Sequence, residues 1–261
     1  MTQLKFIELD ECASTNDEAW AEWTKLAPGG REYAAIAVLG RTQTRGRGRQ
    51  GRKWEGGAPG VNLLLSLATL PPPRNLTWLP LAAGVAAIEA LQSVCVGIAR
   101  PSSLENLRLK WPNDVLLDGP QGGAKLGGIL CETRFSGGKA TGAVIGIGLN
   151  LAESPELEDG RPAAALSVTP VSSELRLELA RAFCEKTLSW IEKLSRGQIF
   201  ELRQTWKRMA KLDRYPELRT HDDAGNAVTL RIVDLDGEGK LVAEAPSADS
   251  FAPKLVTLDQ P

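Results

Sequence analysis

The sequence predicts an α+β fold in which a mixed β-sheet is flanked by helices and followed by a small C-terminal β-domain. The chain has 261 residues, 43% of them hydrophobic, which is enough to bury the core of one large domain. Apolar runs compatible with strands alternate with segments that have helical spacing, and short alternating runs return after about Pro216. We therefore expect one domain over residues 1–212 and a small β-domain over residues 213–261.

The first predicted elements are a strand over residues 5–9 and a helix that begins near Ser14-Thr15-Asn16-Asp17. Short polar side chains cap the free N–H groups of a first helical turn, and an acidic residue there is favoured by the helix dipole. The helix should continue to about Leu26, because Pro28-Gly29-Gly30 follows.

An arginine- and glycine-rich segment, residues 45–53, separates two apolar runs predicted as strands, residues 34–39 and 61–67. Its Gly46-x-Gly48-x-x-Gly51 pattern matches the dinucleotide fingerprint by letter, but no helix pattern follows it. Glycines allow backbone N–H groups to approach a ligand, and arginines donate to phosphate or carboxylate oxygens. The segment therefore suits a polyanion such as ATP, although a solvated tract that binds RNA loosely is the alternative.

The rest of the chain predicts one helix, three strands, a long helical region and a final group of short strands. In order, these are a helix over 78–91, strands over 107–111, 126–132 and 143–149, a helical region over 172–209 with a break at Gly197, and alternating runs over 228–245. This order favours a mixed sheet with helices.

Cysteine usage and the N-terminus predict a cytoplasmic protein that does not insert in a membrane. The four cysteines are widely separated and form no CxxC pair, which favours reduced, buried thiols. The N-terminus carries acidic residues where a signal peptide has an apolar core, and no segment is expected to approach the roughly 18 apolar residues of a membrane span.

Four motifs resemble those of the biotin–protein ligase family in order and spacing: GRGRQGRKW (46–54), KWPNDVLL (110–117), KLGGILCE (125–132) and GIGLN (146–150). With Ser14-Thr15-Asn16, the resemblance covers about residues 5–150. It implies a catalytic domain like that of class II synthetases and a C-terminal SH3-like domain. It also implies that ATP activates biotin as biotinyl-5'-AMP, and that biotin is then passed to a lysine of the biotin carboxyl carrier domain of a biotin-dependent carboxylase.

The resemblance implies a role for each matching residue. Residues expected to bind biotin are Ser14, Thr15, Asn16, Gln43, Gly46, Arg47, Gly48, Arg49 and Lys125. Those expected to bind the nucleotide are Arg49, Arg52, Trp54, Asn113, Lys125 and Asn150, with Trp54 stacking on adenine. Catalytic roles fall to Lys125, Arg49 and Asp114. Lys125 as a solvated strand lysine and Trp54 as an ordinary core residue are the alternatives.

The KWPND motif also has a physical logic of its own. Pro112 lacks an N–H and disfavours helix before it, so the chain must turn there and present Asn113 and Asp114 at the end of a strand. Asp114 would then accept the proton of the attacking lysine amine. An Asx-type turn that only satisfies backbone donors is the alternative for Asn113.

The expected reaction needs no covalent nucleophile from the protein, because the carboxylate of one substrate and the amine of the other make both attacks. His221 is the single histidine, which disfavours Ser-His or Cys-His catalysis and a metal site made of histidines. Magnesium held largely by the ATP phosphates is the ion we expect, and we expect no metal held by the protein itself.

Three departures from the family pattern bear on the expectations. Residues 151–165 contain no tryptophan to cover the adenine, and Asp234 stands where glycine is usual. The chain begins at the predicted catalytic strand, so specific DNA binding is not expected. A lipoate-type acyl–protein ligase and a non-catalytic biotin-binding module are the alternative functions. The protein is expected to be a monomer or a homodimer.

Overall fold

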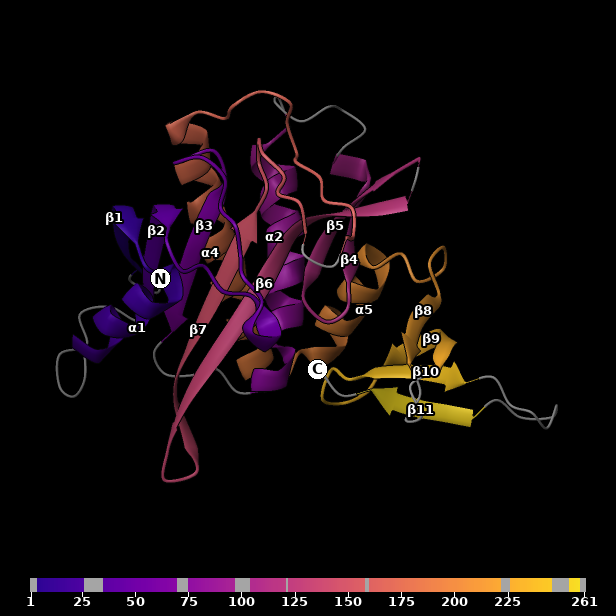
Figure 1. Ribbon diagram of the computed structural model, residues 1–261. Helices are drawn as coiled ribbons and strands as arrows, with labels where there is room; N and C mark the ends of the chain where they lie inside the picture. The colour runs from indigo at the N-terminus through magenta and orange to yellow at the C-terminus, as the bar shows by residue number, and fades with distance from the viewer. Residues whose placement is uncertain are drawn as a thin grey trace.

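The computed structural model describes residues 4–25, 35–69, 75–96, 104–120, 122–157, 160–221, 226–245 and 254–258. Its main feature is a seven-stranded sheet in the order β1-β2-β3-β7-β6-β5-β4 (Figure 1). The strands are β1 (Leu4–Cys12), β2 (Ala35–Gln43), β3 (Leu63–Thr69), β4 (Leu107–Lys110), β5 (Asp114–Gly119), β6 (Gly122–Ser136) and β7 (Lys139–Leu149). β1 and β2 are parallel and the other neighbours antiparallel, so the predicted mixed sheet is confirmed.

Helices cover both faces of this sheet. They are α1 (Thr15–Lys25), α2 (Leu79–Val94), α4 (Ser173–Ser195) and α5 (Ile199–Met209), with short 3-10 turns η1 (Arg49–Gly51) and η2 (Leu76–Trp78). The predicted break at Gly197 is confirmed: it separates α4 from α5 and has a φ of 79°. The expected end of α1 at residues 26–30 lies outside the described residues.

Alternation along the strands divides the core in two. On β2, Ala35, Ala37 and Leu39 face the large core that contains α2 and α4, whereas Ile36 and Val38 face α1. The second core is small and includes Trp20 of α1. Because α1 covers only part of its face, the remainder of that face is available for a binding site.

Helix α2 corrects one expectation. The segment Leu76–Val94 is 19 residues long with a mean hydropathy of 1.2, so by length and composition it is able to cross a membrane, contrary to the sequence reading. In the structure, 67% of its most apolar window is buried inside the protein. The helix is apolar on all sides because it is the central helix of the larger core, packed between the sheet and α4.

The C-terminal strands form a separate four-stranded antiparallel sheet in the order β11-β10-β9-β8. They are β8 (Glu217–His221), β9 (Ala227–Leu235), β10 (Leu241–Ala245) and β11 (Lys254–Leu258). Asp234 on β9 is the residue found in place of the usual glycine. It accepts hydrogen bonds from Arg203 and forms an ion pair with Lys207, and both partners lie on α5. These contacts attach the small sheet to the larger unit.

Two strands differ from the sequence prediction. β5 was not predicted, because its residues directly follow the KWPN turn and read as part of a motif rather than as an element. β6 is much longer than the expected 126–132, because it pairs with β5 at one end and with β7 in a projecting hairpin at the other (Figure 1). The side chain of His221 lies outside the described residues.

Candidate active site

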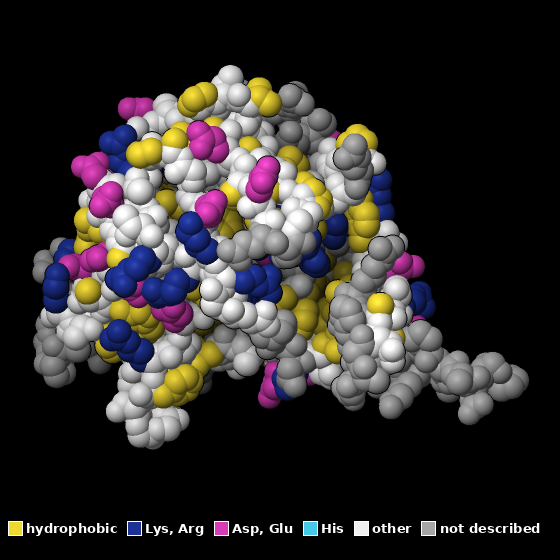
Figure 2. Space-filling view, viewed as in Figure 1, with side chains coloured by type: hydrophobic (Ala, Val, Ile, Leu, Met, Phe, Trp, Pro, Cys, Tyr) yellow, Lys and Arg dark blue, Asp and Glu magenta, His cyan; other side chains and the backbone are white. Residues whose placement is uncertain are grey.

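A cleft of about 730 Å³ opens on the sheet face that α1 partly covers. It is bordered by the start of α1, the β2–β3 loop, the β4–β5 turn and the middle of β6 and β7. Predicted site residues that line it are Ser14, Thr15, Asn16, Gln43, Arg47, Gly48, Arg49, Arg52, Trp54, Asn113, Asp114 and Lys125. Thus residues from four motifs, far apart in sequence, meet in one cavity. In Figure 2, Lys and Arg side chains gather across the middle of the corresponding face.

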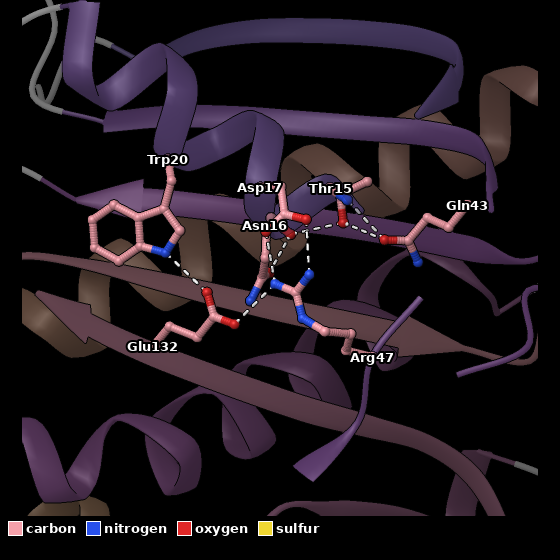
Figure 3. Close-up of polar contacts among 8 residues, drawn as sticks. Thr15, Asn16, Asp17, Trp20, Gln43, Arg47 and Glu132 are labelled. Carbon is pink, nitrogen blue, oxygen red and sulfur yellow. Dashed lines mark hydrogen bonds and ion pairs between the residues drawn. The ribbon is translucent and has the colours of Figure 1, made fainter. Parts of the chain in front are cut away.

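One end of the cleft is a network of short polar side chains from α1 and the sheet (Figure 3). Gln43 Oε1 accepts from the Thr15 backbone N–H at 2.7 Å, and Ser66 Oγ donates to Asn16 Oδ1 at 2.6 Å. Asn16 Nδ2 is buried and has no hydrogen-bond partner among the residues that the structure describes. A buried donor without a partner is costly, so this atom fits a ligand that supplies an acceptor there.

Glycines on β7 make room for the side chains that define the two ends of the cleft. A Cβ on Gly146 would lie 2.3 Å from Asn16 Oδ1, and one on Gly148 would lie 2.2 Å from the indole of Trp54. Both positions share a sheet face, since successive side chains alternate and these residues are two apart. The Gly-x-Gly of GIGLN therefore lets Asn16 and Trp54 lie directly on the strand.

The arginine- and glycine-rich segment forms a tight hairpin rather than an open loop. Arg47 and Lys53 form an antiparallel bridge, and Gly48 N donates to Arg52 O at 2.7 Å. Gly46 does not line the cleft; it packs so closely against the backbone of Trp54 that a Cβ on it would lie 2.4 Å from Trp54 O. The arginines are thereby held in fixed register along the rim.

The arginines of this hairpin have different partners. Arg47, expected to bind biotin, makes a two-pronged ion pair with Asp17 and also contacts Glu132, although it lines the cleft (Figure 3). Arg49 is half-buried, and its guanidinium has no hydrogen-bond or ion-pair partner among the described residues; burial lowers the pKa of this guanidinium. A desolvated cation of this kind is a site for an anion.

Opposite charges meet at the centre of the cleft. Lys125 Nζ lies 2.7 Å from Asp114 Oδ1, and Arg161 lies 3.3 Å from Asp114 Oδ2. Both Asp114 oxygens are therefore engaged, and Lys125 is paired with a carboxylate of the protein itself. The Lys125 ammonium also lies 5.8 Å from the Trp54 ring centroid, where it contributes a cation–π contact.

The far end of the cleft continues into a smaller pocket of about 60 Å³. Trp54, Lys125 and Asn150 line it together with Pro155 to Leu157. Asn150 Nδ2 donates to two backbone carbonyls, whereas its Oδ1 is buried and has no partner in the described part of the chain. In the absence of a tryptophan after β7, Leu157 and its neighbours close this side.

Sequence reasoning did not name Lys110, Arg161 or Ser66, which the structure adds to the site. Lys110 lines the cleft, and burial lowers the pKa of its ammonium. Its place at the start of KWPND, two residues before the turn, was the available signal. Ser66 and Arg161 stand in segments without a motif; in the fold, Ser66 lies behind the cleft and supports Asn16, and Arg161 lines the cleft beside Asp114.

The cleft does not offer a cage for a resident metal ion. Among the described residues, no three His, Cys, Asp or Glu side chains are grouped so that they could hold one ion. The cleft carboxylate Asp114 is neutralised by two cations.

The chain belongs to the biotin/lipoate A/B protein ligase family, whose model matches residues 19–150. A biotin–[acetyl-CoA-carboxylase] ligase of Paracoccus denitrificans is 34% identical over 249 residues, which cover 91% of this chain and 95% of that relative. The ligase of the same name from Mycobacterium tuberculosis is 32% identical over 70% of this chain and 65% of its own length. The biotin protein ligase of Aquifex aeolicus, solved with biotin and ATP, has the same fold, with a TM-score of 0.63 at 23% identity over 100% of this chain and 97% of that chain.

Proposed function

We propose that this protein is an ATP-dependent biotin–protein ligase. It joins biotin and ATP to biotinyl-5'-AMP with release of pyrophosphate, and then transfers biotin to a lysine of a biotin carboxyl carrier domain with release of AMP. The carrier belongs to a biotin-dependent carboxylase, as the name of the Paracoccus relative implies for that enzyme.

The order of polar groups along the cleft carries this proposal. An unpartnered donor, Asn16 Nδ2, stands at one end, the cations Arg49 and Lys125 at the centre, and an unpartnered acceptor, Asn150 Oδ1, at the other. Biotinyl-AMP has the complementary order: a ureido carbonyl, a phosphate, and an adenine amino group. A buried polar atom without a hydrogen-bond partner stands at each end of the cleft. This arrangement favours a ligand that spans the whole cleft.

In the first step, a biotin carboxylate oxygen attacks the α-phosphorus of ATP, and the bond to the pyrophosphate leaving group breaks. Arg49 and Lys125 stabilise the charge that gathers between carboxylate and phosphate. Lys125 exchanges its contact with Asp114 for one with the ligand, and Arg161 keeps Asp114 compensated. The protein contributes position and charge rather than a covalent intermediate.

In the second step, the carrier lysine nitrogen attacks the acyl carbon of the mixed anhydride, the amide bond forms, and AMP leaves. The amine must lose a proton. Asp114 Oδ1 is the acceptor at hand once Lys125 has turned to the phosphate, because it lies at the turn that opens onto the cleft.

Several finer assignments belong to the same proposal. Trp54 stacks on adenine, Arg52 and Asn113 contact the nucleotide, and Gln43 with the start of α1 contacts biotin. Magnesium enters with the ATP phosphates and supplies further neutralisation of their charge. Residues 1–212 form the catalytic domain and residues 213–261 the β-domain, and the reaction takes place in the cytoplasm.

The test is incubation with biotin, ATP, magnesium and a purified carrier domain, followed by intact-mass measurement of the carrier. Addition of one biotinyl group that requires ATP is expected. Parallel reactions with lipoic acid and a lipoyl domain test the lipoate-type alternative, and modification there alone would replace the proposal. Biotin binding without pyrophosphate release would support the non-catalytic module.

A further inference from the structure

We propose that Asp17 and Glu132 are positioning residues that hold Arg47, and through it the arginine- and glycine-rich hairpin, closed over the reaction intermediate. Arg47 then acts as the anchor of the hairpin rather than as a contact to biotin. The inference rests on the proposed function, because the intermediate in question is the acyl-adenylate.

The anchor is a charge network between three separate elements (Figure 3). Arg47 Nη1 and Nη2 each donate to one Asp17 oxygen at 2.7 Å, and Nη2 also donates to Glu132 Oε1 at 3.2 Å. Glu132 is itself oriented, since its Oε2 accepts from Trp20 Nε1 at 2.9 Å. The hairpin is thus tied to the first turn of α1 and to β6 at once.

The geometry of Arg47 leaves its charge little scope for a substrate. A forked pair with a carboxylate uses both terminal nitrogens of the guanidinium in a fixed plane. The hydrogen bond from Arg47 also lowers the pKa of Asp17, as expected when the pair favours the charged carboxylate. Neither Asp17 nor Glu132 lines the cleft. Their effect on the reaction must therefore pass through Arg47.

The backbone carries this anchoring to the catalytic arginine. The Arg47–Lys53 bridge and the bond from Gly48 N to Arg52 O close the hairpin, and the turn at its tip is tight, with φ values of 56° at Gln50 and 73° at Gly51. Arg49 lies within this closed turn. A hairpin tied at Arg47 therefore presents Arg49 to the cleft in one position.

A closed hairpin protects the acyl-adenylate from water and keeps it from leaving the cleft. An acyl-adenylate hydrolyses or diffuses away unless its site excludes solvent. The hairpin forms one wall of the cleft, so its release should shorten the residence of the intermediate more than it changes the first chemical step. Escaped adenylate then acylates lysines of unrelated proteins.

The experiment compares Asp17→Asn and Glu132→Gln with wild type. Glu201→Gln is the control variant, because it removes an ion pair between Glu201 of α5 and Lys193 of α4, away from the cleft. Each enzyme is incubated with biotin, ATP and magnesium, and biotinyl-AMP release and labelling of a bystander protein are measured. The network consists of charge-assisted hydrogen bonds that are partly exposed, so each contributes only modestly. Release of biotinyl-AMP is therefore expected to rise on the order of threefold to tenfold in both variants. Glu201→Gln should match wild type.

Further measurements separate anchoring from mere stability and from direct binding. Asp17→Glu should recover most of the retention, because it restores a carboxylate, while melting temperatures identify any variant that fails to fold. Retention equal to wild type in folded Asp17→Asn and Glu132→Gln would overturn the anchor, as would a loss of retention confined to Arg47→Ala with a raised biotin KM. Absence of adenylate formation by wild type would instead refute the proposed function.

Discussion

Two single-methyl substitutions on β7 should damage opposite ends of the same cleft. Gly148→Ala places a Cβ 2.2 Å from the Trp54 indole, and Gly146→Ala places one 2.3 Å from Asn16 Oδ1. The first should weaken ATP binding and leave biotin binding nearly intact. The second should do the reverse, although the two residues are adjacent on one face of the strand.

The magnitude follows from the overlap. Carbon contacts shorter than 3.0 Å are essentially not tolerated, so the indole must retreat by about 1 Å. Asn16 has less freedom than a surface amide, because Ser66 holds its oxygen at 2.6 Å. Overpacking of this kind costs about 1–3 kcal/mol, which is roughly 5- to 150-fold in the affinity of the ligand that needs the displaced side chain.

Calorimetric titration of biotin alone and of a non-hydrolysable ATP analogue measures both affinities in both variants. A crossed pattern is the expected result. Equal weakening of both ligands in each variant, with a matching fall in melting temperature, would mean that the strand itself is disrupted and that Trp54 and Asn16 do not define separate ends.

Four other outcomes are expected. Lys125→Ala should reduce the rate of pyrophosphate release by the equivalent of ~2.7–4 kcal/mol while the protein stays folded, and normal release would remove Lys125 from the mechanism. Lys110→Met should raise the melting temperature, since burial already disfavours the charged ammonium. It should also raise the KM for ATP several-fold. An unchanged KM would mean that Lys110 does not contact the ATP phosphates. Asp234→Asn should cost about 1 kcal/mol of stability in a urea titration, because it weakens the contacts to Arg203 and Lys207, and no change would show that other contacts hold the small sheet. Because the folded-state pKa of Asp17 is lowered, its contribution to stability is present at neutral pH and lost as the pH falls through that pKa, so the stability difference between wild type and Asp17→Asn should shrink in acid; a constant difference would contradict the ion pair.

The sequence allowed the sheet, most of its strands and the residues of the cleft to be predicted, because local signals specify them. Apolar runs of strand length are visible without a structure, whereas Lys125 and Trp54 were named from the resemblance of their motifs to those of the family. The strand β5 escaped prediction because its alternation is masked by the turn before it.

The partners of the charged residues were beyond sequence reasoning. Arg47 and Glu132 are 85 residues apart, and nothing local indicates that one will neutralise the other. The same holds for Asp114, whose second cation, Arg161, comes from a segment without a motif. Charge pairing depends on the register and connection of strands, which composition and spacing do not encode.

The pairing of Lys125 with Asp114 gives the resting cleft its own counter-ion. An empty site that contained only Arg49, Lys110 and Lys125 would repel itself and collect any small anion from the medium, and chloride or free phosphate would compete with every turnover. With Asp114 in place, an incoming anion must replace the contact between Lys125 and Asp114. Its binding free energy is therefore only the difference between its own contact with Lys125 and that internal contact. Weak monovalent anions gain little from that exchange, whereas a ligand anchored at both ends can displace the carboxylate. At Lys125, the internal carboxylate is thus the competitor that any small anion must displace before either substrate arrives.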